Sequence, residues 1–112
     1  MNAGDPIEEL KALAHPLRMR ILQALTGGER NVGEIEEATG IAQPALSQQL
    51  AVLRNAGLVD TRKQAKLVFY SLNADRFAHV AAVIGELGGV SPASKSANRR
   101  AATGVANFAR LS

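Results

Sequence analysis

Residues 40–58, GIAQPALSQQLAVLRNAGL, and residues 59–72, VDTRKQAKLVFYSL, decide the fold of this chain. The first stretch predicts a turn and then a helix from about Gln43 to Asn55, which ends at Gly57. The second stretch has two short runs of β-forming residues around a charged centre, a pattern typical of a hairpin. A helix-turn-helix followed by a basic hairpin, called a wing, favours DNA binding over catalysis.

The predicted helix has an apolar face and a polar face. Leu46, Leu50 and Leu53 fall within one narrow arc, so this side should pack on a core. Small, amide and hydroxyl side chains occupy the other side, and such groups contact base edges in a major groove. The N-terminal turn should enter the groove deepest, and the expected base contacts are Gln43, Ala45, Ser47 and Gln48. A plain amphipathic surface helix with solvated polar residues is the alternative for this segment taken alone.

Basic residues gather on the predicted helix and hairpin. Residues 43–72 hold four basic residues against one acid, whereas residues 1–42 hold four against seven. Lys63 and Lys66, at the predicted tip, would neutralise phosphates, unless they only keep an edge strand soluble. The residues expected to contact the DNA backbone, or to form the wing that does so, are Arg54, Arg62, Lys63, Gln64 and Lys66.

Four more helices are predicted around this unit. Their first residues follow capping or helix-breaking positions at Asp5, His15, Asn31 and Asn73. The expected fold is therefore mostly α with a small β-hairpin, an α+β winged helix-turn-helix in the order α-α-α-α-β-β-α. We expect residues 1–89 to form this domain and residues 90–112 to form a basic, flexible tail.

The last predicted helix has an apolar stripe that needs a covering surface. A domain of this size buries little core, so a two-fold dimer is favoured over a face that covers its own domain. With the first helix included, the residues expected at this interface are Ile7, Leu10, Phe77, Val80, Ile84 and Leu87.

Composition excludes several classes of protein. The 112 residues include no cysteine, which excludes disulfides and thiolate metal sites. The sequence has no apolar run of about 20 residues and no secretory leader, so we expect a cytoplasmic protein without a membrane partner. It also lacks a nucleophile–base pair and a glycine-rich phosphate loop, so we expect neither an enzyme nor a cofactor.

The segments ALAHPLRMRILQAL, NVGEIEEATGIAQPALSQQLAVLRNAGLV and RKQAKLVFYSL resemble the ArsR/SmtB family of bacterial winged-helix repressors. The resemblance covers roughly residues 7–88. It implies a homodimer formed by the first and last helices, with two recognition helices on a palindromic operator. It also implies an inducer that weakens DNA binding.

The metal-sensing positions of that family are changed in this chain. The resemblance places cysteines of arsenic sensors at Asn31 and Gly33. Zinc sensors use Asp and His on the last helix, where Asp75 and His79 are present but Phe77 replaces an expected His. Two such ligands per chain do not make a tetrahedral zinc site, so no metal is expected.

Within that family, the sequence most resembles the sulfide- and persulfide-responsive branch. The two cysteines of that branch correspond to positions near Gln23 and Gly89 in this chain. The thiol switch of that branch is therefore missing. We expect a sequence-specific DNA-binding regulator, a homodimeric repressor released by an unknown inducer. The alternative is a winged-helix sensor or interaction module that acts mainly through a small ligand or a protein partner.

Overall fold

The structure is a computed structural model, and it describes residues 6–89. The chain divides into two units between Val80 and Ala81, inside the last helix. The elements are α1 (Ile7–Leu13), α2 (Pro16–Ala24), β1 (Arg30–Asn31), α3 (Val32–Thr39), α4 (Ala45–Asn55), β2 (Val59–Gln64), β3 (Leu67–Leu72) and α5 (Ala74–Leu87). The described part of the second unit is the end of α5 with the two glycines that follow. The predicted tail and the Asp5 cap lie outside the described residues.

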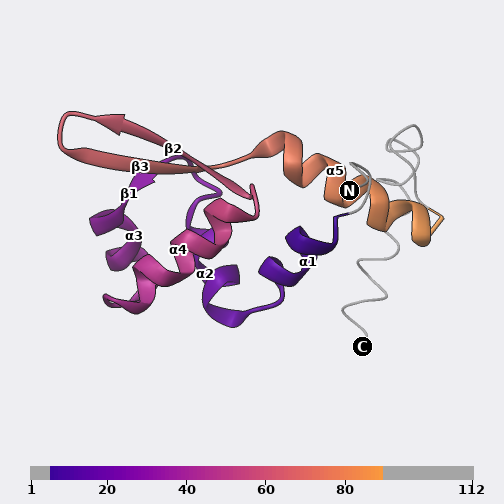
Figure 1. The fold of residues 1–112 in the computed structure, drawn as a ribbon, viewed down its shortest axis with the longest axis horizontal. Helices are drawn as coiled ribbons and strands as arrows, with labels where there is room; N and C mark the ends of the chain where they lie inside the picture. Colours follow the sequence, from indigo (N-terminus) through magenta and orange to yellow (C-terminus); the bar gives the residue numbers. More distant parts are fainter. Residues whose placement is uncertain (1–5, 90–112) are drawn as a thin grey trace. The chain divides into compact units, whose positions relative to one another are not determined.

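The sheet has three antiparallel strands in the order β1-β3-β2, where two strands were predicted. The added strand β1 pairs Arg30 with Tyr70 and Asn31 with Phe69. A strand of two residues leaves no alternation in the sequence, which is why the prediction missed it. The element order is therefore α-α-β-α-α-β-β-α, and the prediction of a mostly helical α+β fold is confirmed (Figure 1).

The wing is the hairpin of β2 and β3. Its pairing runs from Val59 opposite Leu72 to Gln64 opposite Leu67. Lys63 therefore lies within β2 and not at the tip, which corrects the prediction. The strand prediction failed because an exposed hairpin holds polar residues without an apolar alternation. Figure 1 shows the two strands side by side, with the turn projecting beyond α3 and α4.

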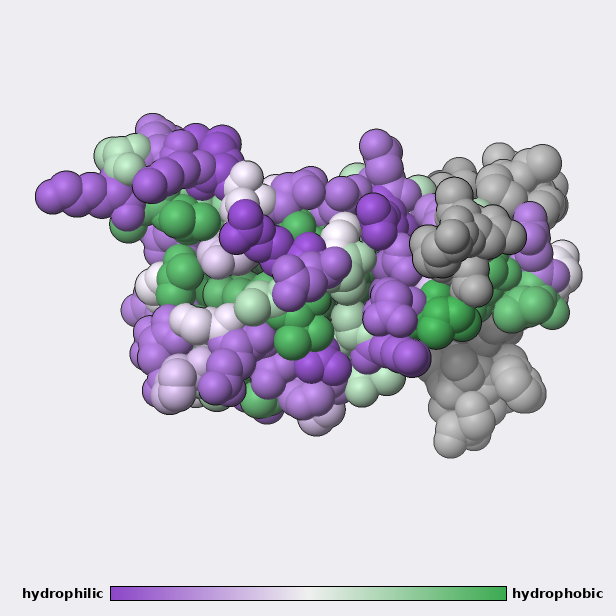
Figure 2. All heavy atoms as spheres, viewed as in Figure 1, coloured by the Kyte–Doolittle hydropathy of each residue, from purple (hydrophilic) through white to green (hydrophobic). Residues whose placement is uncertain are grey.

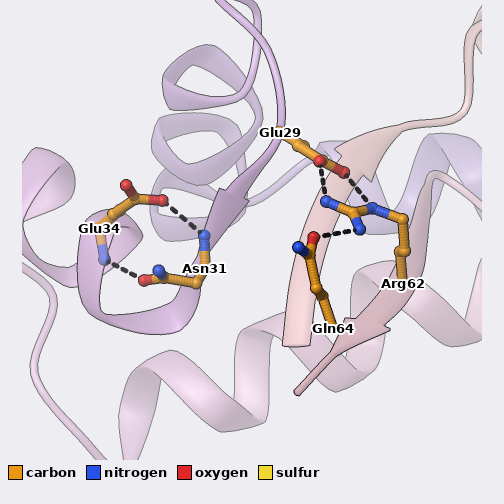
Figure 3. Close-up of polar contacts among 5 residues, drawn as sticks. All are labelled: Glu29, Asn31, Glu34, Arg62 and Gln64. Atoms are coloured by element: carbon orange, nitrogen blue, oxygen red, sulfur yellow. Dashed lines mark hydrogen bonds and ion pairs between the residues drawn. The ribbon is translucent and has the colours of Figure 1, made fainter. Parts of the chain in front are cut away.

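Local hydrogen bonds confirm three of the predicted helix starts. Asn31 and Glu34 form a reciprocal capping box, with both bonds 2.9 Å long (Figure 3). The Nδ1 atom of His15 accepts a 3.1 Å bond from the amide of Leu17. The imidazole of His15 is therefore the N-cap of α2. The side chain of Asn73 similarly accepts a 2.9 Å hydrogen bond from the amide of Arg76 in the first turn of α5.

The core lies where α2, α3, α4 and the start of β2 meet. Its largest side chains are completely or almost completely buried: Ile21, Ile35, Leu46, Leu50, Leu53, Leu58 and Val59. The predicted apolar face of α4 is thereby confirmed. Burying each such leucine contributes roughly 1.5–3 kcal/mol, so these contacts decide which face of α4 turns outward.

No helix in residues 6–89 has both the length and the apolar character needed to cross a membrane. The longest of them, α5, has 14 residues, against the roughly 20 that a bilayer requires.

Candidate nucleic-acid interface

The outward face of α4 carries short polar and apolar side chains. Ser47, Gln48 and Asn55 are exposed on this face, together with Ala51. Ala45 is the first residue of the helix and is half-buried. A surface of amide, hydroxyl and methyl groups matches the donors, acceptors and thymine methyl groups of a major groove.

Gln43 lies before α4, because the helix begins at Ala45 and not at Gln43 as predicted. Its Oε1 atom accepts two bonds from Ser47, one from the amide at 3.0 Å and one from the hydroxyl at 2.6 Å. The first of these bonds satisfies an amide that the helix start leaves without a backbone partner. The structure thus brings two of the four predicted base-contacting residues together, and the amide NH₂ of Gln43 makes no hydrogen bond to residues 6–89.

Gln48 differs from this pair because its side chain makes no hydrogen bond to any residue between 6 and 89. It lies one turn into α4 and is exposed. A free carboxamide can donate and accept at once, which is the combination that adenine offers in the major groove. Among residues 6–89, the carboxamide of Gln48 therefore has both its donor and its acceptor free.

A polar contact from α2 that sequence patterns did not predict supports the middle of α4. Arg18 Nη1 donates to Gln49 Oε1 at 2.9 Å, while its Nε donates to the carbonyl oxygen of Ala12 at 2.7 Å. One guanidinium therefore joins the end of α1 to the side of α4. No local motif marks Arg18, since its partners lie 6 and 31 residues away.

A second arginine, Arg76 of α5, contacts the backbone directly after α4. Arg76 Nη1 donates to Glu9 Oε2 at 2.8 Å and to the carbonyl oxygen of Ala56 at 3.3 Å. The side chain of Glu9 is only 10% exposed. A hydrogen bond from its own backbone amide and then the Arg76 guanidinium lower the pKa of Glu9, while burial acts in the opposite direction.

Arg62 spans the wing sheet rather than pointing away from it. Its Nε donates to Glu29 Oε2 at 3.2 Å, its Nη2 donates to Glu29 Oε1, and its Nη1 donates to Gln64 at 2.6 Å (Figure 3). On the way it passes over Phe69, whose ring centroid lies 4.9 Å from Cζ. We call this set, Arg62 with Glu29, Gln64 and Phe69, the wing brace. It connects β2, across β3, to the residue before β1.

Arg62, one of the cations predicted to contact the DNA backbone, is engaged in the wing brace. Hydrogen bonding to Arg62 lowers the pKa of Glu29, and the same bond raises the pKa of Arg62. Lys63 and Lys66 have no ion-pair partner among residues 6–89 and are exposed. Arg54, near the end of α4, is likewise exposed without a partner in that range. Figure 2 shows hydrophilic side chains gathered over the wing.

Comparisons with known proteins agree with this geometry. Residues 15–61 match the family described as "Bacterial regulatory protein, arsR family". A "Transcriptional activator HlyU" of Vibrio cholerae is 45% identical over 65% of this chain and 68% of its own length. The chain belongs to the ArsR family.

Two repressors extend the comparison. The "Biofilm growth-associated repressor" of Agrobacterium fabrum is 54% identical over 63% of this chain, and the match spans 61% of that repressor. The crystal structure of the transcriptional repressor BigR from Xylella fastidiosa aligns with a TM-score of 0.60 and 42% identity, over 72% of this chain and 83% of that one. These likenesses confirm the winged-helix fold of this ArsR-family protein and support a DNA-binding transcriptional regulator.

The residues predicted for a dimer interface differ in exposure in this ArsR-family chain. Ile7 is 47% exposed, Ile84 is 45% exposed and Leu87 is 82% exposed. Leu10 and Phe77 are half-buried, and Phe77 packs partly on the core of its own unit. Val80 is only 5% exposed in the single chain. The exposed members of the set are therefore the ones that have surface left for a partner.

Asp75 and His79, the two positions that resemble part of a zinc site, differ in their surroundings. Asp75 is exposed on the first turn of α5, whereas His79 has a buried Nε2 atom with no hydrogen-bond partner within residues 6–89. In that range no group of three or more His, Cys, Asp or Glu side chains is placed to hold a metal.

Proposed function

We propose that this ArsR-family protein is a homodimeric transcriptional repressor that binds a palindromic operator and is released by an inducer. The observation that carries the proposal is the pairing of two surfaces in one fold. Gln48 on the outward face of α4 and Lys63 and Lys66 on the wing are exposed, and within residues 6–89 their side chains have no hydrogen-bond or ion-pair partner. The first can contact bases, and the second can contact phosphates.

Exposed apolar side chains on the first and last helices support the homodimer. Ile7 on α1 and Leu87 on α5 both expose about half or more of their surface. A second copy of the chain can cover such residues by a two-fold arrangement, in which each patch meets its own equivalent. Two copies of α4 related by that axis would contact half-sites about one helical turn of DNA apart, which requires a palindrome.

The names of the relatives support a regulator rather than an enzyme, and they include both repressors and an activator. We propose repression as the direction, since it requires only that a bound dimer block the promoter. A regulator of this kind acts where the chromosome is, which in a bacterium is the cytoplasm.

The experiment is fluorescence anisotropy of the purified protein on labelled duplex from directly upstream of its own gene. Unlabelled random duplex is added as a competitor at two salt concentrations. We expect binding that survives the competitor and weakens as salt rises, because neutralised phosphates release counterions. Equal loss of signal with the random duplex and with the unlabelled upstream duplex, at both salts, would contradict sequence-specific binding to that region.

The dimer is tested separately by sedimentation equilibrium. Leu87→Glu places a charge on the proposed interface and should shift the protein towards a monomer. Leu67→Glu is the matched control, because Leu67 on the wing is also an exposed leucine, 50% accessible. A monomeric wild-type protein, or equal behaviour of the two variants, would contradict the proposed interface.

A further inference from the structure

Given the DNA-binding role proposed above, we infer that Arg76 is a positioning residue, which fixes the C-terminal end of α4 against α1 and the first turn of α5. Three separate helices meet at its guanidinium. Nη1 reaches Glu9 of α1 at 2.8 Å and the carbonyl oxygen of Ala56, directly after α4, at 3.3 Å. We call Arg76, Glu9 and the Ala56 carbonyl the α4 joint.

The backbone that carries Arg76 is itself held in place. Its amide donates to the Asn73 side chain at 2.9 Å, which caps the start of α5. The amide of Asn73 in turn donates to the carbonyl oxygen of Leu58 at 2.9 Å, and Leu58 is fully buried. The backbone from which the guanidinium extends is therefore tied to the core.

Gly57 leaves the space that this contact needs. The residue has φ +80°, and a Cβ placed on it would lie 2.7 Å from Arg76 Nη1 and 2.8 Å from Cζ. Both distances are far below van der Waals contact, so any side chain at this position would displace the guanidinium. The sequence predicts Gly57 as a helix stop only, while the structure gives it this second role at the joint.

The electrostatics of the joint favour a cation at this place. The carbonyl groups at the end of α4 carry the negative end of the helix dipole, which attracts a positive charge. The carboxylate of Glu9 is 10% exposed, whereas the Arg76 side chain is 42% exposed. Removal of the guanidinium would therefore take a charge-assisted hydrogen bond from a largely buried carboxylate and leave the Ala56 carbonyl without this donor.

The joint matters for DNA because the leucines beneath α4 do not control every movement of the helix. Leu46, Leu50 and Leu53 decide which face is buried, but apolar contacts are non-directional and permit small shifts along the helix. A bidentate base contact by Gln48 tolerates little displacement, because hydrogen bonds weaken steeply with distance and angle. Directional contacts at the end of α4 supply the missing restraint.

The test compares Arg76→Gln with Lys11→Gln, since each variant removes one positive charge. Lys11 is the matched control because its side chain is 70% exposed and, among the residues that the structure describes, pairs with the exposed Glu8 alone. The probe is a duplex that the wild-type protein selects from a randomised pool. Affinity is measured by anisotropy over a series of salt concentrations. The protein concentrations are those at which sedimentation shows the same oligomeric state for all variants. The temperature is one at which urea titration shows each variant to be folded.

We expect Arg76→Gln to lose affinity for the selected duplex on the order of tenfold, and Lys11→Gln to stay near the wild-type value. The slope of log affinity against log salt should not change in Arg76→Gln, because the number of neutralised phosphates stays the same. A residue needed only for stability would leave the affinity of the folded protein unchanged. Wild-type affinity in Arg76→Gln, or a slope that falls by about one, would overturn the positioning role.

The same experiment separates loss of the α4 joint from loss of DNA binding. A wild-type protein that selects no duplex would contradict the function itself, whereas selection with an unaffected Arg76→Gln would contradict the α4 joint alone. Should Arg76→Gln not fold, Glu9→Gln takes its place, because it keeps the size of the side chain and removes only the charge. Reduced affinity at an unchanged salt slope then supports the joint, and unchanged affinity overturns it.

Discussion

Helix α4 rests on three leucines that are at most 1% exposed, whereas the charged residues of β2 in the wing are exposed. The two elements are proposed to contact the same DNA, yet different forces hold them. Burial of apolar surface holds α4 together with the polar contacts of Arg18 and Arg76, and salt does not screen that burial. In the wing, the exposed Arg62–Glu29 ion pair and a cation–π contact add to the strand pairing, and salt screens the ion pair. The protein thus joins a helix packed on the core to a hairpin whose charged side chains are exposed.

The largest expected effect comes from the core beneath α4. Leu53→Ala should lower the free energy of unfolding by about 2–5 kcal/mol, because it removes a fully buried side chain and leaves a cavity. Urea denaturation measures the change. Leu67→Ala on the wing is the control, and its half-exposed side chain should contribute little. Similar losses in the two variants would break the distinction between the two elements.

The same difference explains how much of the fold could be predicted from the sequence. The leucines of α4 recur at helical spacing, and the capping box at Asn31 joins neighbours in the chain, so local patterns were sufficient. The strand β1 was missed because two residues carry no period, and Lys63 was placed at the tip because a polar strand resembles a loop. Burial leaves a periodic signal in the sequence, and exposed backbone pairing does not.

The second prediction concerns base contact by α4. Gln48→Ala should lower discrimination between the selected duplex and single-base variants of it by about 1–3 kcal/mol at one position, because alanine cannot form the bidentate hydrogen bonds. Competition anisotropy with these variant duplexes measures it. Gln23→Ala, which changes an exposed glutamine on α2, is the control. An equal loss on cognate and random DNA would show that Gln48 does not contact a base.

The third prediction concerns backbone contact by the wing. Lys63→Ala should weaken binding to cognate and random DNA alike, and should reduce the slope of log affinity against log salt by about 0.9, because one phosphate is no longer neutralised. Lys11→Ala removes a charge from α1 and should leave the slope unchanged. A change in base preference with an unaltered slope would instead make Lys63 a base-contacting residue.

The sequence predicts the exposed residues of the candidate site, but not the arginines that hold these residues in position. Gln48, Lys63 and Lys66 were chosen by residue type and position, and the structure leaves all three exposed. The arginines that hold the site were missed or given another role. Arg76 meets a partner 67 residues away, and Arg62 meets one 33 residues away. Pairs formed only by tertiary folding leave no spacing rule in a single sequence.

The smallest expected effect lies in the wing brace. Glu29→Gln should not measurably change the urea midpoint at neutral pH, because the pair that it breaks is exposed to solvent. The local effect should still be visible as a shift of the Arg62 Nε–H signal in NMR spectra, with Lys66→Gln as a control outside the brace. Unshifted Arg62 signals in Glu29→Gln would show that the brace does not persist in solution.

Acid should have the same effect as this substitution, and the sign follows from the pKa of Glu29. Hydrogen bonding to Arg62 lowers that pKa below its usual value, so folding favours the ionised carboxylate. The contribution of the pair is therefore present above the pKa of the unfolded chain and is lost as pH falls through the lower folded value. In a pH titration the wild-type Arg62 signal should move towards its position in Glu29→Gln within that acidic range. A signal that instead moved near neutral pH would point to a different titrating group beside Arg62, and the brace would then not depend on Glu29.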